Sequence, residues 1–169
     1  MNYLKVYYSI IYKARNLERD GYLELHHIIP RSIFGEGLLN QNGILGVNHD
    51  DNLVYLSARE HFVAHWLLHR AFPKNKKLGL AFWAMPGMIS PDHKRDYLPS
   101  SRAIAEAREA AVNARKTPIL QYNLNGNFVT EFKSLNDASE KVGVVPNAIY
   151  GRRSDRSYFK VFSWNFQIF

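Results

Sequence analysis

Two stretches of the chain decide its fold, LELHHIIP at residues 23–30 and DNLVYLSAREHFVAH at residues 51–65. The first is rich in residues that favour strands and closes at a proline. In the second, a short strand over 53–56 is followed by Ser57 and, three positions later, Glu60. That pair is a capping box, which predicts a helix starting at the next residue. The predicted order is therefore strand, loop, strand, helix.

Four of the seven histidines lie in these two stretches, namely His26, His27, His61 and His65. Residues four apart on a helix stand on the same face, so His61 and His65 can offer two ring nitrogens to one ion. Successive side chains of a strand point to opposite faces, so His26 and His27 are expected to have different roles. One could bind metal while the other acts as a base. The alternative is that His61 and His65 are simply half-buried polar residues on an amphipathic helix. That alternative does not explain why His26 and His27 occur together on the strand.

The segments LHHIIP (25–30), DNLVYL (51–56) and EHFVAH (60–65) together resemble the HNH nuclease motif. They are similar to the homing endonucleases of phages and introns, and colicin DNases share the spacing of the metal site. The resemblance covers residues 22–70. It implies a ββα-metal fold and a metal-dependent DNA endonuclease.

Carried over by position, the resemblance also implies roles for individual residues. The metal ligands would be His26, His61 and His65. His27 would be the general base, and Asn52 would hold the loop between the strands and keep that base in register. Glu24 matches an acidic position that supports the site. The interval between His27 and Asn52 is longer than in compact members of the family, so the glycine-rich loop at 34–49 is an insertion expected to alter the rim of the site.

The chemistry of phosphodiester hydrolysis suits these residue types. A water molecule must be deprotonated near neutral pH, and imidazole is the side chain suited to that task. A divalent cation stabilises the charge that develops on the phosphate and the leaving oxygen. The resemblance implies 5′-phosphate and 3′-hydroxyl products and one divalent metal ion. Homing enzymes of this type generally use Mg or Mn, whereas three imidazoles also suit Zn or Ni.

Two arginines close to the motif are candidate phosphate-binding residues. Arg31 follows the proline that ends the first strand, and Arg59 lies in the first turn of the helix. Either guanidinium could bind a DNA phosphate. Plain surface positions are the alternative, and for Arg59 the two readings are evenly balanced.

The tail of the chain has a different sequence pattern. Residues 119–132 predict a hairpin around Asn125-Gly126, two short helices follow, and a last strand is expected over 158–166. Residues 118–166 resemble the NUMOD-type DNA-binding modules found behind HNH and GIY-YIG homing enzymes. The resemblance implies a helix-turn-helix contact with DNA through Asn147, Tyr150, Arg152, Arg153 and Arg156.

A helix expected over 100–116 separates these two regions. It is rich in Ala, Glu and Arg and has little apolar surface, which is typical of a helix that bridges modules. We therefore predict a nuclease domain over 1–99, a linker helix over 100–117 and a DNA-binding module over 118–169. The fold class is α+β, with flanking helices around the ββα core and short strands in the C-terminal module.

Composition narrows the classes of protein and partner. The 169 residues carry a net charge of +7, which favours polyanions such as nucleic acid. Because there is no cysteine, disulfides, thiolate zinc sites and a cysteine nucleophile are excluded. No run is long enough to cross a membrane, and the N-terminus lacks a signal-peptide cleavage site. An intracellular protein is expected, in the cytoplasm of a bacterial or phage-infected cell.

These observations predict a site-specific DNA endonuclease of the homing type that acts on double-stranded DNA. One active site in a monomer favours nicking of one strand, unless two copies dimerise on a palindromic site. One alternative is a DNA-binding regulator whose histidines hold a structural metal. Another is an HNH toxin, which would usually carry a translocation domain.

Overall fold

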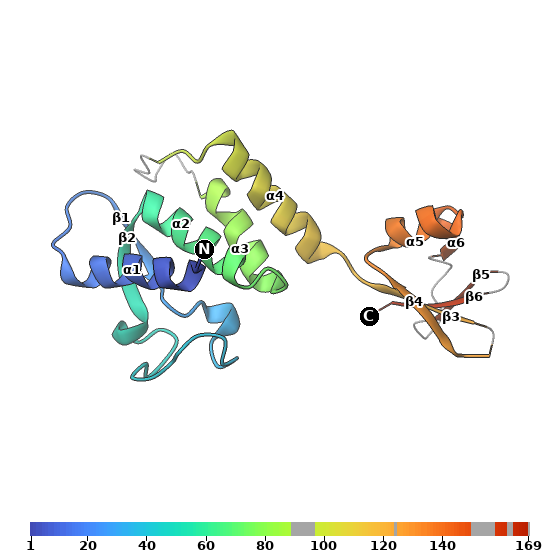
Figure 1. Cartoon of the computed structure of the whole chain (residues 1–169). Coiled ribbons are helices and arrows are strands. Elements are labelled where there is room, and N and C mark those ends of the chain that lie inside the picture. The colour runs from blue at the N-terminus through green and yellow to red at the C-terminus, as the bar shows by residue number, and fades with distance from the viewer. Residues whose placement is uncertain (89–96, 124, 150–157, 162–163, 169) are drawn as a thin grey trace. The chain divides into compact units, whose positions relative to one another are not determined.

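The computed structural model describes residues 1–88, 97–123, 125–149, 158–161 and 164–168 (Figure 1). The chain forms two compact units, Met1–Ala114 and Arg115–Phe169. The first unit is mainly helical around a two-stranded sheet, and the second contains a four-stranded sheet with two short helices. The α+β fold class predicted from the sequence is confirmed.

The first unit is built around two antiparallel strands and the helix that follows them. Strand β1 (Leu23–His27) pairs with β2 (Leu53–Ser57), and α2 (Ala58–Ala71) begins at the next residue. Each strand buries its second and fourth residues, which on β1 are Glu24 and His26. Short 3₁₀ helices, η1 (Arg31–Ile33) and η2 (Asp50–Asn52), flank the loop between the strands. The predicted order of strand, loop, strand, helix is present.

The start of α2 is fixed by the predicted capping box. The Ser57 hydroxyl accepts from the Glu60 backbone N–H at 3.3 Å, and the Glu60 carboxylate accepts from the Ser57 backbone N–H at 3.0 Å. Arg19 donates to both carboxylate oxygens of Glu60. Hydrogen bonding from Arg19, with smaller contributions from Ser57, lowers the pKa of Glu60. The segment before β1 is thereby attached to the first turn of α2.

Helix α1 (Tyr3–Asn16) packs on the same core. Its N-terminus is capped by Asn2, whose side chain accepts from the Lys5 backbone N–H at 3.0 Å. Its buried residues are Tyr7 and Ile11, which face aliphatic side chains from the sheet and α2.

Helices α3 (Lys76–Gly87) and α4 (Ser101–Arg115) complete the first unit. The buried residues of α4 are Ala107, Ala110 and Ala111. Helices α3 and α4 approach each other closely at Gly79. A Cβ added there would lie 3.3 Å from the backbone oxygen of Ala110. The helix expected to link two modules is therefore packed within the first unit. Its contacts are made by small alanine side chains and do not need a large apolar face.

The described part of the second unit contains six short elements. They are β3 (Ile119–Asn123), β4 (Phe128–Phe132), α5 (Leu135–Val142), α6 (Pro146–Ile149), β5 (Tyr158–Val161) and β6 (Trp164–Ile168). All pairings in the sheet are antiparallel, in the order β4-β3-β6-β5. The single last strand expected over 158–166 is wrong, because two strands pair with each other there. The described core comprises Ile119, Phe132, Ala138 and Ile149.

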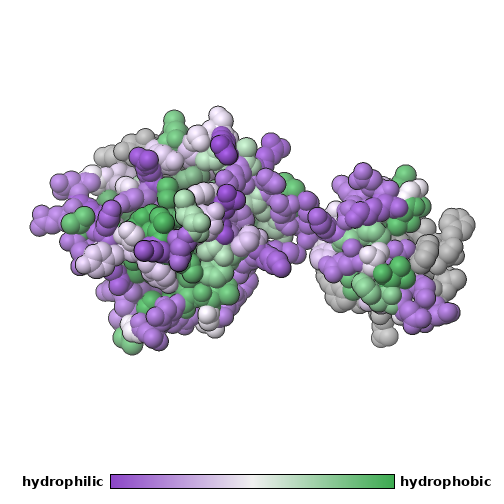
Figure 2. Space-filling view, in the orientation of Figure 1, coloured by the Kyte–Doolittle hydropathy of each residue, from purple (hydrophilic) through white to green (hydrophobic). Residues whose placement is uncertain are grey.

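The surface of each unit is mixed in polarity. Figure 2 shows hydrophilic side chains over most of the visible face of each unit, with hydrophobic patches between them. Among the described residues, no helix combines the length and apolarity needed to span a bilayer.

Candidate metal centre and active site

Three histidine rings converge beside the two-stranded sheet. One potential ligand atom from each of His26, His61 and His65 lies within 4.8 Å of the others. The ring centroids are 5.0 to 5.2 Å apart. His26 and His61 are buried, and His65 is half-buried. This spacing allows the three rings to face one point, as ligands of a single ion must.

Local structure explains why these rings meet. His26 lies on the buried face of β1, which α2 covers, and His61 and His65 stand one turn apart on α2. Because α2 follows β2 without an intervening residue, the capping box at Ser57 sets which face of the helix meets the strand.

Glu24 supports the cluster from the same face of β1. Its Oε2 lies 2.7 Å from Nδ1 of His61, and both side chains are buried. A carboxylate can only accept, so Nδ1 of His61 carries the proton and donates it to Glu24. The other nitrogen, Nε2, then keeps its lone pair for a metal ion. Such carboxylate–histidine pairs are the usual outer contacts of metal sites.

The electrostatics of His26 favour its neutral form. Burial lowers its pKa well below the ordinary value, and the rings of His65, His61 and His27 lower it further. On its other side, His26 contacts Tyr7, whose hydroxyl lies 3.0 Å from Nε2 of the ring. Burial, with a smaller effect of Tyr8, raises the pKa of Tyr7 well above the ordinary value. Both groups are therefore uncharged at neutral pH, and a neutral imidazole is the form that binds metals.

His27 shares a cleft with the cluster although it alternates with His26 along β1. The cleft has a volume of about 260 Å³ and is lined by the three clustered histidines, by His27 and by Arg31. The half-buried His27 has its Nε2 3.1 Å from Oδ1 of Asn48, a residue of the loop between the strands. The arrangement places a titratable ring, an arginine and three candidate ligands around one space large enough for a phosphate group.

Asn52 holds the loop and the end of β1 together. Its side chain is fully buried, and its Oδ1 accepts from the Ile29 backbone N–H at 2.8 Å. Its Nδ2 donates to the carbonyl oxygens of Ile29 at 3.1 Å and Val47 at 2.8 Å. Asn52 therefore joins Val47 of the loop to Ile29, which lies two residues after His27.

Comparison with known proteins reveals close relatives. The chain is 36% identical over 121 residues to "Probable mobile endonuclease E" of Enterobacteria phage T4, an alignment that covers 71% of the chain and 77% of the relative. The chain belongs to the phage mobile endonuclease family. Residues 117–150 also match the NUMOD1 domain, within the second unit.

Two further relatives are longer than this chain. "Probable mobile endonuclease B" of the same phage is 33% identical over 167 residues, covering 83% of the chain and 58% of the relative. "Probable mobile endonuclease D" is 37% identical over 114 residues, covering 64% of the chain and 40% of the relative. The chain thus spans about half the length of these two mobile endonucleases. No solved structure matches the chain significantly.

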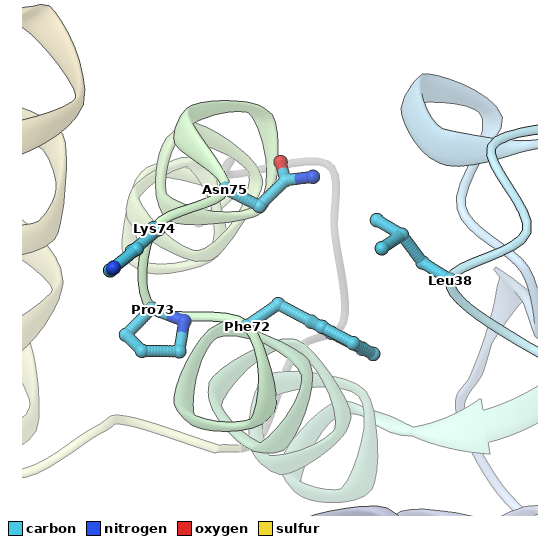
Figure 3. A pocket seen from close by; sticks show the side chains of 5 residues that line it. All are labelled: Leu38, Phe72, Pro73, Lys74 and Asn75. Atoms are coloured by element: carbon cyan, nitrogen blue, oxygen red, sulfur yellow. The ribbon is translucent and has the colours of Figure 1, made fainter.

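A larger pocket lies elsewhere in the first unit. It has a volume of about 520 Å³, and Figure 3 shows Leu38 facing Phe72 and Asn75 across it, with Pro73 and Lys74 at its side. None of the described residues that line it carries a carboxylate or an imidazole. The histidine cleft therefore remains the candidate functional site.

The remaining predicted residues lie outside the cleft or outside the described part of the chain. Arg59 is exposed in the first turn of α2 and is not among the described residues that line the cleft. Asn147 belongs to α6, but its side chain is not described. The other predicted DNA contacts lie outside the described residues, namely Tyr150, Arg152, Arg153 and Arg156.

Two side chains at the site were missed from the sequence, Tyr7 and Asn48. Tyr7 is one of four tyrosines in α1, and nothing in their spacing tells which side chain reaches a histidine. Asn48 lies in a glycine-rich loop whose path has no periodicity to follow. The signal available from the sequence was the residue type, because a tyrosine hydroxyl usually has a hydrogen-bond partner when it is buried.

Proposed function

We propose that this chain is a site-specific DNA endonuclease of the HNH type, hydrolysing phosphodiester bonds with one divalent metal ion and His27 as general base. The observation that carries the proposal is the cleft in which His27 and Arg31 lie beside three convergent histidines. Membership of the mobile endonuclease family supports the same reaction.

The donor set fits a divalent cation. His26, His61 and His65 offer three nitrogen ligands, and Glu24 orients the His61 ring from behind. When bound, the cation would act as a Lewis acid for the phosphate and the leaving 3′ oxygen. Nitrogen ligands suit Zn or Ni by ligand softness, whereas Mg or Mn would take further oxygen ligands. Mg or Mn is our proposal for the working ion, on the family resemblance.

His27 performs the proton transfer. A ring nitrogen of His27 accepts a proton from a water molecule, and the water oxygen attacks the phosphorus as the bond to the 3′ oxygen breaks. The leaving oxygen takes a proton from solvent, which gives a 3′-hydroxyl and a 5′-phosphate end. Arg31, exposed at the rim of the cleft, binds the phosphate and holds it in line. Asn52 keeps the loop that carries Asn48 against the end of β1.

The second unit supplies the sequence preference in this proposal. It contains the NUMOD1 match and two short helices, α5 and α6, separated by a turn. Contact between this unit and a duplex would be helped by the net charge of +7. A monomer with one cleft of this kind would nick one strand of double-stranded DNA, and two copies on a palindrome would cut both.

Incubation with supercoiled plasmid tests the proposed reaction. Added Mg or Mn should produce nicked circles before linear DNA, and EDTA should abolish both products. Zn and Ni, tested separately, identify which ions support cleavage. A protein that binds metal and DNA but leaves the plasmid intact under every metal condition would instead be a regulator with a structural metal site.

Substitution of His27 separates the base from the ligands. His27→Ala should lower the rate of cleavage by about 10²- to 10⁴-fold, because a general base is lost, and should leave metal affinity unchanged. His65→Ala should reduce both cleavage and metal affinity. His49→Ala is the control, since His49 is an exposed loop residue outside the lining of the cleft. Cleavage at the wild-type rate by the His27 variant would refute the assigned base.

A further inference from the structure

The hydroxyl of Tyr7 is a polar atom placed in the core of the first unit. Tyr7 is 0% exposed, and its hydroxyl lies 3.0 Å from Nε2 of His26 and 2.6 Å from the carbonyl oxygen of Ile28. It reaches β1 from α1, outside the segments that resemble the nuclease motif. A buried hydroxyl with one partner on the candidate ligand His26 and the other at Ile28, directly after β1, requires an explanation.

Counting protons fixes the direction of both hydrogen bonds. The phenol of Tyr7 has one proton, and the carbonyl of Ile28 can only accept. The proton of Tyr7 therefore points to Ile28, and the phenolic oxygen accepts a second proton from Nε2 of His26. In the opposite arrangement the phenolic and carbonyl oxygens would face each other at 2.6 Å with no proton between them, which costs the desolvation of an unpaired buried group.

From this geometry we propose that Tyr7 is a positioning residue of the metal centre, which holds His26 in the tautomer protonated on Nε2. The ligand atom of His26 is then Nδ1, which keeps its lone pair. This inference rests on the proposed function, in which His26, His61 and His65 bind the cation. Tyr7 acts on His26 as Glu24 acts on His61, but through the opposite ring nitrogen.

The hydrogen bond also fixes the orientation of the ring. His26 stands edge-on to His61, at an interplanar angle of 74°, and to His65, at 88°. A half-turn about the bond to the ring would exchange Nδ1 for a carbon atom and remove the ligand. The bond from Nε2 to Tyr7 opposes that rotation. Because Tyr7 is neutral, it orients the ring without adding a second negative charge to that of Glu24.

Zinc titration of the metal-free full chain tests the role of Tyr7. Tyr7→Phe removes one oxygen atom and should weaken zinc affinity by about 10- to 100-fold, the usual effect of losing an outer contact of a metal ligand. Two control variants should bind zinc as the wild type does. Ile11→Val trims a buried side chain on the same helix and controls for packing, and Tyr12→Phe removes a hydroxyl that is exposed.

Nitrogen-15 NMR of the histidine rings at pH 8 gives a readout that does not depend on metal or activity. In the metal-free wild type the His26 ring should carry its proton on Nε2, and in Tyr7→Phe the two tautomers should mix. A wild-type ring protonated on Nδ1 overturns the inference, even if the Tyr7 variant does not fold. Equal zinc affinity of the folded variant and the wild type also overturns it. Failure of the wild type to bind zinc, nickel or manganese is a different result, which overturns the proposed metal site itself.

Discussion

The two units differ in what they bury. In the first, four of the described polar or charged residues are buried, each at most 7% exposed, namely Glu24, His26, Asn52 and His61. In the second, Gln121 is the one buried polar residue among those whose side chains are described. Burying a polar group is costly unless it is hydrogen-bonded. In the first unit Glu24, His26 and His61 are bonded at the histidine cluster, and Asn52 bonds to the backbone of Ile29 and Val47.

This difference separates two ways of using a core. The first unit buries several polar groups, most of them beside imidazoles, whereas the described core of the second unit is apolar apart from Gln121. We therefore expect substitutions in the first unit to change metal binding and cleavage. Substitutions in the second unit should change its stability and the recognition of DNA.

Separating the units should produce the largest effect. A fragment ending at residue 116 should still cleave DNA in the presence of metal, but its preference for a cognate duplex over a scrambled one should fall from about 10³-fold or more to near unity. Residues 117–169 alone should bind DNA without cutting it. Competition binding and plasmid cleavage measure both properties. Site-specific cleavage by the shorter fragment would show that the second unit is not the main reader.

Asn52→Ala should strongly destabilise the first unit. The change leaves the N–H of Ile29 and the carbonyls of Ile29 and Val47 without their partner, and one such buried group costs about 1–3 kcal/mol. Urea unfolding of the 1–116 fragment measures the loss. Asn42→Ala, an exposed change in the same loop, is the control. Equal stability of the two variants would contradict the buried network.

Gly143→Ala should destabilise the second unit alone. Gly143 ends α5 with a φ of 74°, a left-handed conformation that costs other residues about 1–2 kcal/mol. An added Cβ meets nothing within 4 Å, so the cost is conformational and not steric. Thermal unfolding of residues 117–169 should shift, while metal affinity of the full chain stays constant. Gly87→Ala, at the end of α3 with no positive φ, should not destabilise its unit.

The smallest effect concerns the acid sensitivity of His69. Burial lowers its pKa, with Glu106 opposing and Arg70 adding to the shift, and its ring stacks on Phe82 at 5.7 Å. Because the folded pKa is below the unfolded value of about 6.5, the unfolded state binds more protons, and stability is lost as the pH falls below that value. His69→Gln should therefore lose less stability between pH 7 and pH 5 than the wild type. Identical pH profiles would refute this contribution.

The sequence predicts most of the first unit's central architecture. The box of Ser57 and Glu60 gives the start of α2, and helical spacing gives the shared face of His61 and His65. Both are local patterns, in which a few neighbouring residues determine the geometry. The roles of the ligands and of His27 stay predictions.

Contacts between distant segments could not be predicted in this way. Tyr7 reaches His26 across 19 positions, and Asn48 reaches His27 across 21. The packing of α4 on Gly79 depends on close helix approach, which a count of apolar residues does not detect. The division of the last strand into β5 and β6 was missed because residues 158–166 contain neither glycine nor proline.

The direct passage from β2 into α2 limits how the length of this chain can vary. A residue inserted between Ser57 and Ala58 would turn the helix by about 100° relative to the sheet, carrying His61 and His65 away from His26. The loop between Gly35 and Gly43 is not tied to the face of a helix: apart from the buried Leu39, it is bounded by left-handed glycines at both positions, which let the chain change direction there. Insertions and deletions should therefore be tolerated in that loop but not at the strand–helix junction. A library of length variants, screened for cleavage, would show which segments must keep their length, without substitution of individual side chains.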